Sequence, residues 1–207
     1  MLLQGKVVIV SGIGPGLGQE LAVLAAREGA EAVVLAARTA QKLDAAEQDI
    51  NTLGLGTRVL KVTTDIADQA QCQALAAQTL DAFGRIDVLF NSAYDPGSFE
   101  PIAQANLDHW RRAMDVNFFG TMQLTQACVP AMIEAGGGAV VMIGTMVEHK
   151  PLATQGGYGS SKSALRSATK HLALELGQHG IRVNSCHMGW MWGPAVEGYF
   201  AWQAAES

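Results

Sequence analysis

The stretch KVVIVSGIGPGLG, residues 6–18, decides the fold. It opens with an apolar, β-branched run, as expected of a parallel strand that is buried on both faces. Four glycines then occupy alternate positions from Gly12 to Gly18, and the apolar stripe of a helix continues to Gly29. Strand, glycine loop and helix predict a phosphate cradle, because glycines let the backbone approach a pyrophosphate and helix N–H groups point at it.

The spacing of the glycines narrows the kind of cradle. A Gly-x-Gly-x-x-Gly pattern that starts at Gly12 would need its third glycine at Leu17, so the pattern present is Gly12-x-x-x-Gly16-x-Gly18. The lysine and hydroxyl of a nucleotide-triphosphate P-loop are missing, which leaves phosphoryl transfer unsupported. An ordinary tight turn between a strand and a helix is the alternative interpretation of this loop.

The rest of the chain alternates short apolar runs with longer helical ones. Further strands are predicted at residues 32–37, 58–63, 86–90, 139–143 and 181–186, and helices at residues 39–53, 67–83, 104–135 and 157–177. Pro130 is expected to bend or divide the third of these helices. The alternation predicts an α/β Rossmann fold, a doubly wound parallel sheet with helices on both faces and ligands at the strand carboxyl ends.

Composition bounds the class of protein. A chain of 207 residues that is 49% hydrophobic and 16% charged suits one domain, which we place at residues 1–207. The net charge of −5 argues against a nucleic-acid partner. No apolar run reaches the roughly 18 residues of a membrane span, and the first residues lack a signal-peptide pattern. We therefore expect no membrane partner and a cytoplasmic location.

The cysteines and the last aromatic residues carry weaker signals. Cys72, Cys128 and Cys186 are odd in number and far apart, so buried reduced thiols are expected and no metal site. Three of the four tryptophans follow residue 187. These aromatic residues either plug the core or form one wall of an apolar substrate pocket.

Tyr158 and Lys162 form the candidate catalytic pair. Four residues apart in a predicted helix, they occupy one face, one turn from each other. A phenol has a pKa of about 10, and a nearby positive charge favours the phenolate, so such a tyrosine can exchange a proton with a substrate oxygen. A half-buried tyrosine beside a solvated lysine is the alternative. Thr145 follows the fifth predicted strand, and Asn117 lies further upstream.

The ordered motifs resemble those of a known family. Gly12-x-x-x-Gly16-x-Gly18, Asp65, Asn91-Ser92-Ala93, Asn117, Tyr158-x-x-x-Lys162 and Ile181-Arg182-Val183-Asn184 are similar to the signature of the short-chain dehydrogenases/reductases, over residues 5–193. The resemblance implies reversible hydride transfer between a nicotinamide and an alcohol/carbonyl pair. Tyr158 would be the acid/base, and Lys162 would lower its pKa and hold the nicotinamide ribose. Asn117 would position a water in a proton relay, and Thr145 would take the place of the usual serine.

The resemblance also implies a set of cofactor contacts. They are Ser11, Gly12, Gly14, Gly16, Leu17, Gly18, Arg38, Asp65, Ile66, Asn91, Ala93, Tyr158, Lys162 and Gly189. Ala37 occupies the place where an acidic residue would accept the ribose 2′-hydroxyl of NAD, and Arg38 follows, ready to meet a 2′-phosphate. NADP(H) is therefore favoured over NAD(H), although Pro15 stands where NADP-binding members often carry a second basic residue.

This chain also departs from the family pattern. Ser92 and Tyr94 replace the second asparagine and the glycine of the usual turn after strand four, Met188 replaces a proline, and Gly193 replaces a threonine that commonly helps to hold the cofactor. These changes bear on cofactor affinity more than on the chemistry, and Tyr94 places bulk near the cofactor or the substrate entrance.

Two functions from different classes follow. The first is an NAD(P)-dependent oxidoreductase that acts on a small, hydrophobic secondary alcohol or ketone, with steroid, terpenoid, fatty-acyl and xenobiotic ketones all suited to an apolar pocket. The second is an NAD(P)-binding sensor or scaffold of the same fold without turnover. Family members normally carry another helix and strand that often build the dimer contact. We therefore expect the native protein to continue past Ser207 and to form a homodimer or homotetramer.

Overall fold

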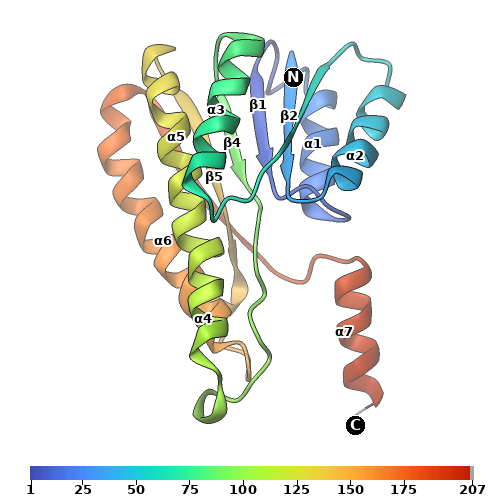
Figure 1. Ribbon diagram of the computed structural model, residues 1–207, viewed down its shortest axis with the longest axis vertical. Helices are drawn as coiled ribbons and strands as arrows, with labels where there is room; N and C mark the ends of the chain where they lie inside the picture. Colours follow the sequence, from blue (N-terminus) through green and yellow to red (C-terminus); the bar gives the residue numbers. More distant parts are fainter. Residues whose placement is uncertain (206–207) are drawn as a thin grey trace.

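Six parallel strands form a single sheet in the order β3-β2-β1-β4-β5-β6 (Figure 1). The computed structural model describes residues 1–205. Its strands are β1 (Val7–Ser11), β2 (Ala32–Ala37), β3 (Arg58–Thr63), β4 (Val88–Asn91), β5 (Gly138–Thr145) and β6 (Ile181–Met188). The chain order reverses between β1 and β4, which is the switch point where open α/β sheets bind ligands.

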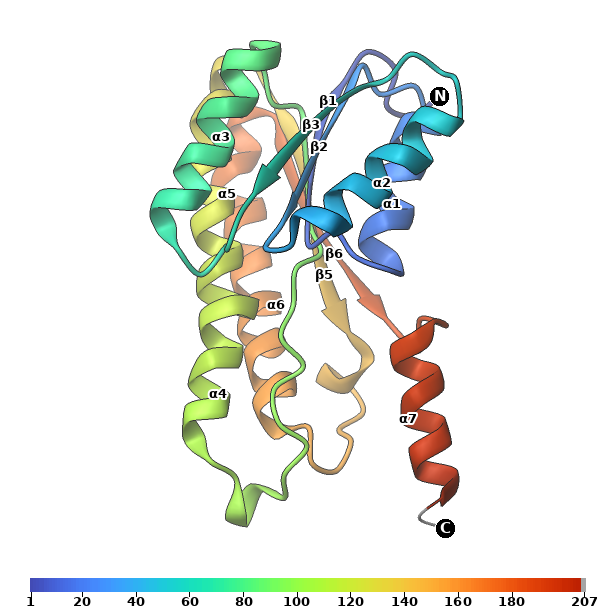
Figure 2. The same ribbon diagram turned by 45° about the vertical axis from the view of Figure 1, so that its right-hand side comes forward.

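Helices cover both faces of this sheet (Figure 2). The α-helices are α1 (Leu17–Arg27), α2 (Ala40–Thr52), α3 (Gln69–Phe83), α4 (Leu107–Met114), α5 (Thr121–Glu134), α6 (Gly156–Leu176) and α7 (Pro194–Ala205). Short turns of 3-10 helix lie at η1 (Ile102–Gln104), η3 (Met146–Glu148) and η4 (Gly177–His179), and a π-helical turn, η2, at Asp115–Gly120. The pair α1 and α2 lies on one face and α3, α5 and α6 on the other, while α7 stands apart from these layers. The predicted doubly wound Rossmann fold is confirmed.

The central strands divide their side chains between two cores. Ile9 and Val34 pack into the cluster beneath α3 and α5, whereas Val8, Val10 and Leu35 pack into the cluster beneath α1 and α2. Because successive residues of a strand point to opposite faces, a strand covered on both sides needs a continuous apolar run. This is why residues 7–10 show no alternation of polar and apolar types.

The helical region after β4 differs from the prediction. Of the two outcomes predicted for Pro130, a bend or a division of the helix, the division is wrong, because α5 runs from Thr121 to Glu134 as one helix. The proline removes one N–H near the end of the helix, and buried Cys128 and Met132 on either side keep that turn packed on the core. The interruption lies at η2 instead, where a Cβ added at Gly120 would come within 2.8 Å of the Ile66 carbonyl oxygen.

The thiols also differ in part from the expectation. Cys72 and Cys128 are free and buried, and burial raises their pKa to about 11 and about 12. Cys186 is free but exposed, because it shares an uncovered face of β6 with Arg182 and Asn184. Among residues 1–205, none of the helices combines the length and the hydropathy that a membrane crossing requires.

Substitution of Gly12 tests whether the turn between β1 and α1 requires glycine at this position. Its φ is +86°, and an added Cβ would overlap the backbone nitrogen of Ala93. We expect Gly12→Ala to lose about 2–5 kcal/mol from backbone strain and overpacking, which lowers the Tm by roughly 5–15 °C. The matched control is Gly177→Ala, where φ is −56° and a Cβ meets no atom within 4 Å in the described part of the chain. Thermal unfolding of both variants measures the difference, and equal melting temperatures would contradict it.

Candidate active site

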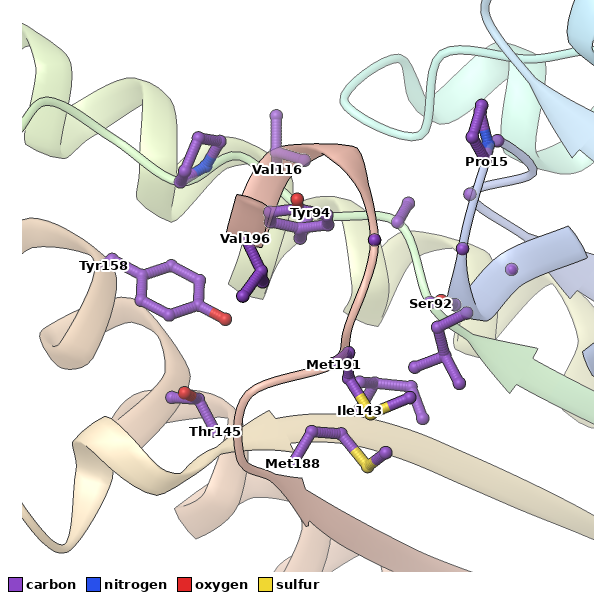
Figure 3. A pocket seen from close by; sticks show the side chains of 18 of the residues that line it. Pro15, Ser92, Tyr94, Val116, Ile143, Thr145, Tyr158, Met188, Met191 and Val196 are labelled. Carbon is purple, nitrogen blue, oxygen red and sulfur yellow. The ribbon is translucent and has the colours of Figure 1, made fainter. Parts of the chain in front are cut away.

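A cavity of about 880 Å³ runs along the carboxyl edge of the sheet, from the glycine loop to α6 (Figure 3). Most of the predicted site residues line it. They are Gly12, Gly14, Gly16, Leu17, Gly18, Arg38, Asp65, Ile66, Ala93, Thr145, Tyr158, Lys162 and Gly189. The fold thus brings residues from the first to the last strand into one continuous space at the switch point.

Two predicted cofactor residues do not line this cavity. Ser11 is fully buried, and its hydroxyl donates to the Phe90 carbonyl at 3.3 Å. Asn91 is buried at the end of β4, and its Nδ2 donates to Thr125 Oγ1 of α5 at 3.0 Å. Because alternate residues of a strand face opposite sides, the Asn91 side chain is directed beneath α5. Both side chains therefore hold strand ends in place and do not line the cavity.

The glycine loop fits the pyrophosphate of a dinucleotide. A Cβ at Gly18 would overlap the Gly12 carbonyl oxygen, so α1 can begin this close to β1 only with glycine there. A Cβ at Gly16 meets nothing within 4 Å among residues 1–205, and one at Gly14 meets only the Lys42 side chain, from 3.6 Å. The loop backbone is thus open to the cavity at the N-terminus of α1, where helix N–H groups favour an anion.

Tyr158 presents its hydroxyl to the cavity beside Thr145 (Figure 3). Burial raises the pKa of this phenol, the hydrogen bond with Thr145 acts in the opposite direction, and Tyr94 and Glu148 raise it further. The expected lowering by Lys162 is therefore absent from this structure. The physical reason is that burial outweighs the favourable contacts, while the ammonium of Lys162 is directed to a backbone carbonyl.

Lys162 is the largest fully buried side chain of the protein's described part, with 2% of its surface exposed. Its Nζ donates to the Ile143 carbonyl oxygen at 2.7 Å. Burial lowers its pKa from 10.5 to about 8, and the nearby Glu148 carboxylate opposes that shift. The amine is thus still mostly protonated at neutral pH, and it lines the cavity.

Thr145 ends β5 and caps the turn η3. Its hydroxyl accepts from the Val147 N–H at 3.4 Å, and its own N–H donates to Glu148 Oε1 at 2.9 Å. This reciprocal capping box fixes the backbone on which the threonine hydroxyl stands. Glu148 supports Thr145 from outside the cavity and was missed by the sequence analysis, although the spacing Thr145-x-x-Glu148 is the signal that could have found it.

Asn117 is fully buried within the π-helical turn and does not line the cavity. Its Oδ1 accepts from the Asp95 N–H at 2.7 Å, and its Nδ2 donates to the Asp95 carbonyl at 2.8 Å and to Ser161 Oγ at 2.9 Å. Ser161 in turn donates to the Tyr158 carbonyl at 2.8 Å. The side chain of Asn117 therefore joins the loop after β4 to the first turns of α6, which fixes the backbone of Tyr158.

Aromatic residues between positions 190 and 202 form one wall of the cavity. Trp190 and Tyr199 stack with ring centroids 5.1 Å apart, and both line the cavity together with Trp192 and Trp202. Trp192 is 72% exposed, so the interpretation that these aromatic side chains pack into the hydrophobic core is wrong. Figure 3 shows the segment from Met188 to Val196 arching across the pocket opposite Tyr158.

Lys42 is the second residue that the sequence analysis missed. It lies on α2 and lines the cavity with Arg38, and its Nζ is 3.7 Å from the position of a Cβ at Gly14. The signal that could have identified Lys42 is its spacing, because it is a basic residue in the first turn of a predicted helix, four positions after Arg38. Lys42 thus places a second basic group in the cavity beside Arg38, although position 15, where NADP-binding members often carry one, is a proline.

Comparison with known proteins places the chain in a family. Residues 6–204 match the family model of the short chain dehydrogenases, and the chain belongs to this family. A short chain dehydrogenase/reductase of Aspergillus oryzae, astE, is 36% identical over 189 residues, which cover 90% of this chain and 71% of the relative. Levodione reductase of Leifsonia aquatica is 31% identical over 192 residues, 93% of this chain and 72% of the relative.

Solved structures agree with this membership. The crystal structure of levodione reductase has a TM-score of 0.93 and 29% identity and covers 99% of this chain and 79% of its own. That of NAD⁺-bound xylitol dehydrogenase has a TM-score of 0.90 and 28% identity, with coverages of 99% and 76%. The protein is an NAD(P)-dependent oxidoreductase that acts on a CH–OH group.

Proposed function

We propose that the protein transfers hydride between a nicotinamide and an apolar secondary alcohol or ketone, with Tyr158 as the acid/base. One observation carries the proposal. The Tyr158 hydroxyl and the open glycine loop line the same cavity as the aromatic side chains of Trp190, Trp192, Tyr199 and Trp202. Apolar walls with a few convergent polar groups are typical of sites for small hydrophobic molecules.

The chain's own residues would divide the chemistry as follows. Bound NAD(P)(H) supplies or accepts the hydride. Tyr158 Oη passes a proton to the substrate oxygen in reduction and removes it in oxidation. Thr145 Oγ1 donates a second hydrogen bond that orients this oxygen, and Lys162, whose ammonium donates to the Ile143 carbonyl, would hold the nicotinamide ribose. Trp190 and Tyr199 would contact the apolar part of the substrate.

Turnover separates this function from a silent NAD(P)-binding protein. We expect the absorbance of reduced cofactor to change with members of a panel of hydrophobic ketones and alcohols, while polar sugars of similar size react slowly. Cofactor binding is followed independently by quenching of tryptophan fluorescence, which the tryptophans of the cavity wall make sensitive. Binding without turnover on every panel member would contradict the enzyme and favour the sensor or scaffold.

We propose NADP(H) as the preferred cofactor. Ala37 leaves no carboxylate at the end of β2, and Arg38 and Lys42 both line the adjacent part of the cavity. Two cations suit a 2′-phosphate, because charge-assisted hydrogen bonds to phosphate oxygens are about twice as strong as neutral ones. The xylitol dehydrogenase neighbour was solved with NAD⁺, so this preference would distinguish the present chain from that relative.

Arg38→Ala tests this preference. Loss of a hydrogen bond to a charged group costs about 1.5–3 kcal/mol, so we expect kcat/KM with NADPH to fall roughly 10- to 150-fold. The value with NADH should change by less than about threefold, because that cofactor has no 2′-phosphate. Lys42→Ala should act in the same direction with a smaller effect. Equal losses with both cofactors would remove the argument.

The assembly and the compartment of the protein are also proposals. We propose a homodimer or homotetramer, which sedimentation equilibrium would distinguish from a monomer. We propose a cytoplasmic location because Cys72 and Cys128 are buried free thiols, as expected in a reducing compartment. Fractionation of cells that express the untagged protein tests it, and recovery with membranes or in the medium would contradict it.

A further inference from the structure

A cluster of three potential metal ligands lies behind the catalytic threonine. Glu148 and His149 end the turn that follows β5, and His187 lies near the end of β6. The parallel pairing of these strands places Gly144 opposite His187, which brings the two segments together. One ligand atom from each of the three side chains lies within 4.8 Å of the other two. None of the three lines the cavity described above.

Glu148 supplies a buried oxygen that needs a positive partner. The side chain has no exposed surface, and its Oε1 accepts from the Thr145 N–H. Its Oε2 has no hydrogen-bond partner within residues 1–205 and lies 3.3 Å from His187 Nδ1. A buried carboxylate oxygen without a donor is costly, so the geometry favours a cation at this point.

His187 is oriented as a ligand. Its Nε2 lies 3.0 Å from Ser185 Oγ. When Nε2–H donates to this hydroxyl, the lone pair of Nδ1 faces Glu148 Oε2, and two acceptors at 3.3 Å repel unless a proton or a metal lies between them. Zinc bonds of about 2.0–2.2 Å at a tetrahedral angle separate two ligand atoms by about 3.4 Å. A metal-binding imidazole usually donates its other ring N–H to a carboxylate, a backbone carbonyl or a water, and the Ser185 hydroxyl takes that place for the tautomer with Nε2–H.

His149 completes the donor set. Its ring lies edge-on to that of His187, with ring centroids 5.0 Å apart, and it is exposed, so a side-chain rotation can bring its nitrogen to the same ion. We propose that Glu148, His149 and His187 bind one divalent ion of the zinc class. Two imidazoles and one carboxylate suit zinc, cobalt or nickel, whereas magnesium and calcium prefer oxygen ligands alone.

Such an ion would join the ends of β5 and β6. These ends carry Thr145 and Met188, which both line the catalytic cavity. The site therefore goes beyond the proposed hydride transfer, because it would stabilise two loops of the cavity without contacting substrate. Binding to the folded protein alone raises its stability, and at a concentration one hundred times the Kd we expect the Tm to rise by about 5–10 °C.

Metal titration of the tag-free protein tests the proposal. The exposed thiol of Cys186 is a competing ligand, so the Cys186→Ser form serves as the parent. We expect Zn²⁺ to bind with a stoichiometry of one by calorimetry and Co²⁺ to give the intense visible bands of a tetrahedral site. Glu148→Gln keeps an acceptor for the Thr145 N–H, yet it should weaken Zn²⁺ at least about tenfold. His187→Gln should do the same, and the matched control is His171→Gln, an exposed histidine of α6.

A plain ion pair between Glu148 and protonated His187 is the competing account. In that case Zn²⁺ binds the parent no more tightly than the Glu148→Gln form, and that result would overturn the metal site. A readout that needs no folded variant is the imidazole NMR spectrum of the parent. Zn²⁺ should shift the ring nitrogens of His149 and His187, and equal shifts of all five histidines would also overturn the proposal.

Discussion

Tyr158→Phe is expected to lower kcat by about 10²–10⁴-fold, which is the range that general acid/base catalysis contributes. The variant keeps the ring and loses only the hydroxyl that faces the cavity beside Thr145. The edge-on contact between the rings of Tyr158 and Tyr94, whose centroids are 6.4 Å apart, should survive. The proton of the substrate oxygen would then have no acceptor at the reacting end of the cavity.

The control for this variant is cofactor binding. Tryptophan quenching by NADPH should give the parent Kd within about threefold, because the variant keeps the ring of residue 158 and all the other predicted cofactor contacts. Tyr94→Phe is the matched substitution, since it removes a second hydroxyl from the same cavity without touching the proposed proton path. Comparable losses in both variants would show that the cavity's shape or polarity, and not the acid/base, was disturbed.

Thr145→Val should cost roughly 10²–10³-fold in kcat. One oriented hydrogen bond to a developing charge contributes about 2.7–4 kcal/mol, and valine keeps the shape of threonine while it removes the donor. The Thr145 N–H would still donate to Glu148 Oε1, so the backbone of the turn should keep its place. The lost bond from Val147 to the threonine hydroxyl is long, at 3.4 Å, and should cost little stability.

Thr145→Ser is the matched control and should remain active. It keeps the hydroxyl and removes the methyl group that fixes χ1 and narrows the pocket, so the range of accepted substrates should widen. A valine variant as fast as the parent, beside an inactive Tyr158→Phe, would remove Thr145 from the chemistry. The proton path would then depend on Tyr158 alone.

The strands were predictable because their signal is local. The run at residues 7–10 is apolar without alternation, and a glycine loop and a helix follow it directly. The positions of Tyr158 and Thr145 in the cavity followed from the same logic, since residues after parallel strands meet at one edge of the sheet. The π-helical turn at 115–120 was not predictable, because its residues continue a helical pattern and only the packing of Gly120 on Ile66 distinguishes it.

Side-chain direction was the part that sequence could not supply. Asn91 ends a strand at the cavity edge, and a shift of one position along the strand decides between the cavity and the underside of α5. Likewise the Asn117 amide is fully occupied by Asp95 and Ser161, which are far from it in sequence. Lys42 lines the cavity, and Glu148 lies behind Thr145, only because α2 and η3 begin just beyond strands that end at the same edge.

The buried amine of Lys162 makes the protein's stability and its chemistry respond to alkali in opposite ways. In the unfolded chain this group holds its proton up to about pH 10.5, whereas in the fold its pKa is about 8. Between these values the unfolded state binds more protons, so the free energy of unfolding rises with pH, by up to roughly 3 kcal/mol. Below pH 8 both states are protonated, and the cost of burying the charge is present in full.

On the proposed role of Lys162 as a charged contact of the cofactor, activity is expected to fall as the pH passes 8 in the free enzyme, while urea unfolding midpoints climb over the same range. The raised pKa of Tyr158 has the reverse effect above pH 10, where the unfolded phenol ionises first and stability declines. At neutral pH the buried cation of Lys162 therefore destabilises the fold. An alkaline solution is thus expected to give a more stable protein with lower activity, and selection for thermal stability alone would act against Lys162.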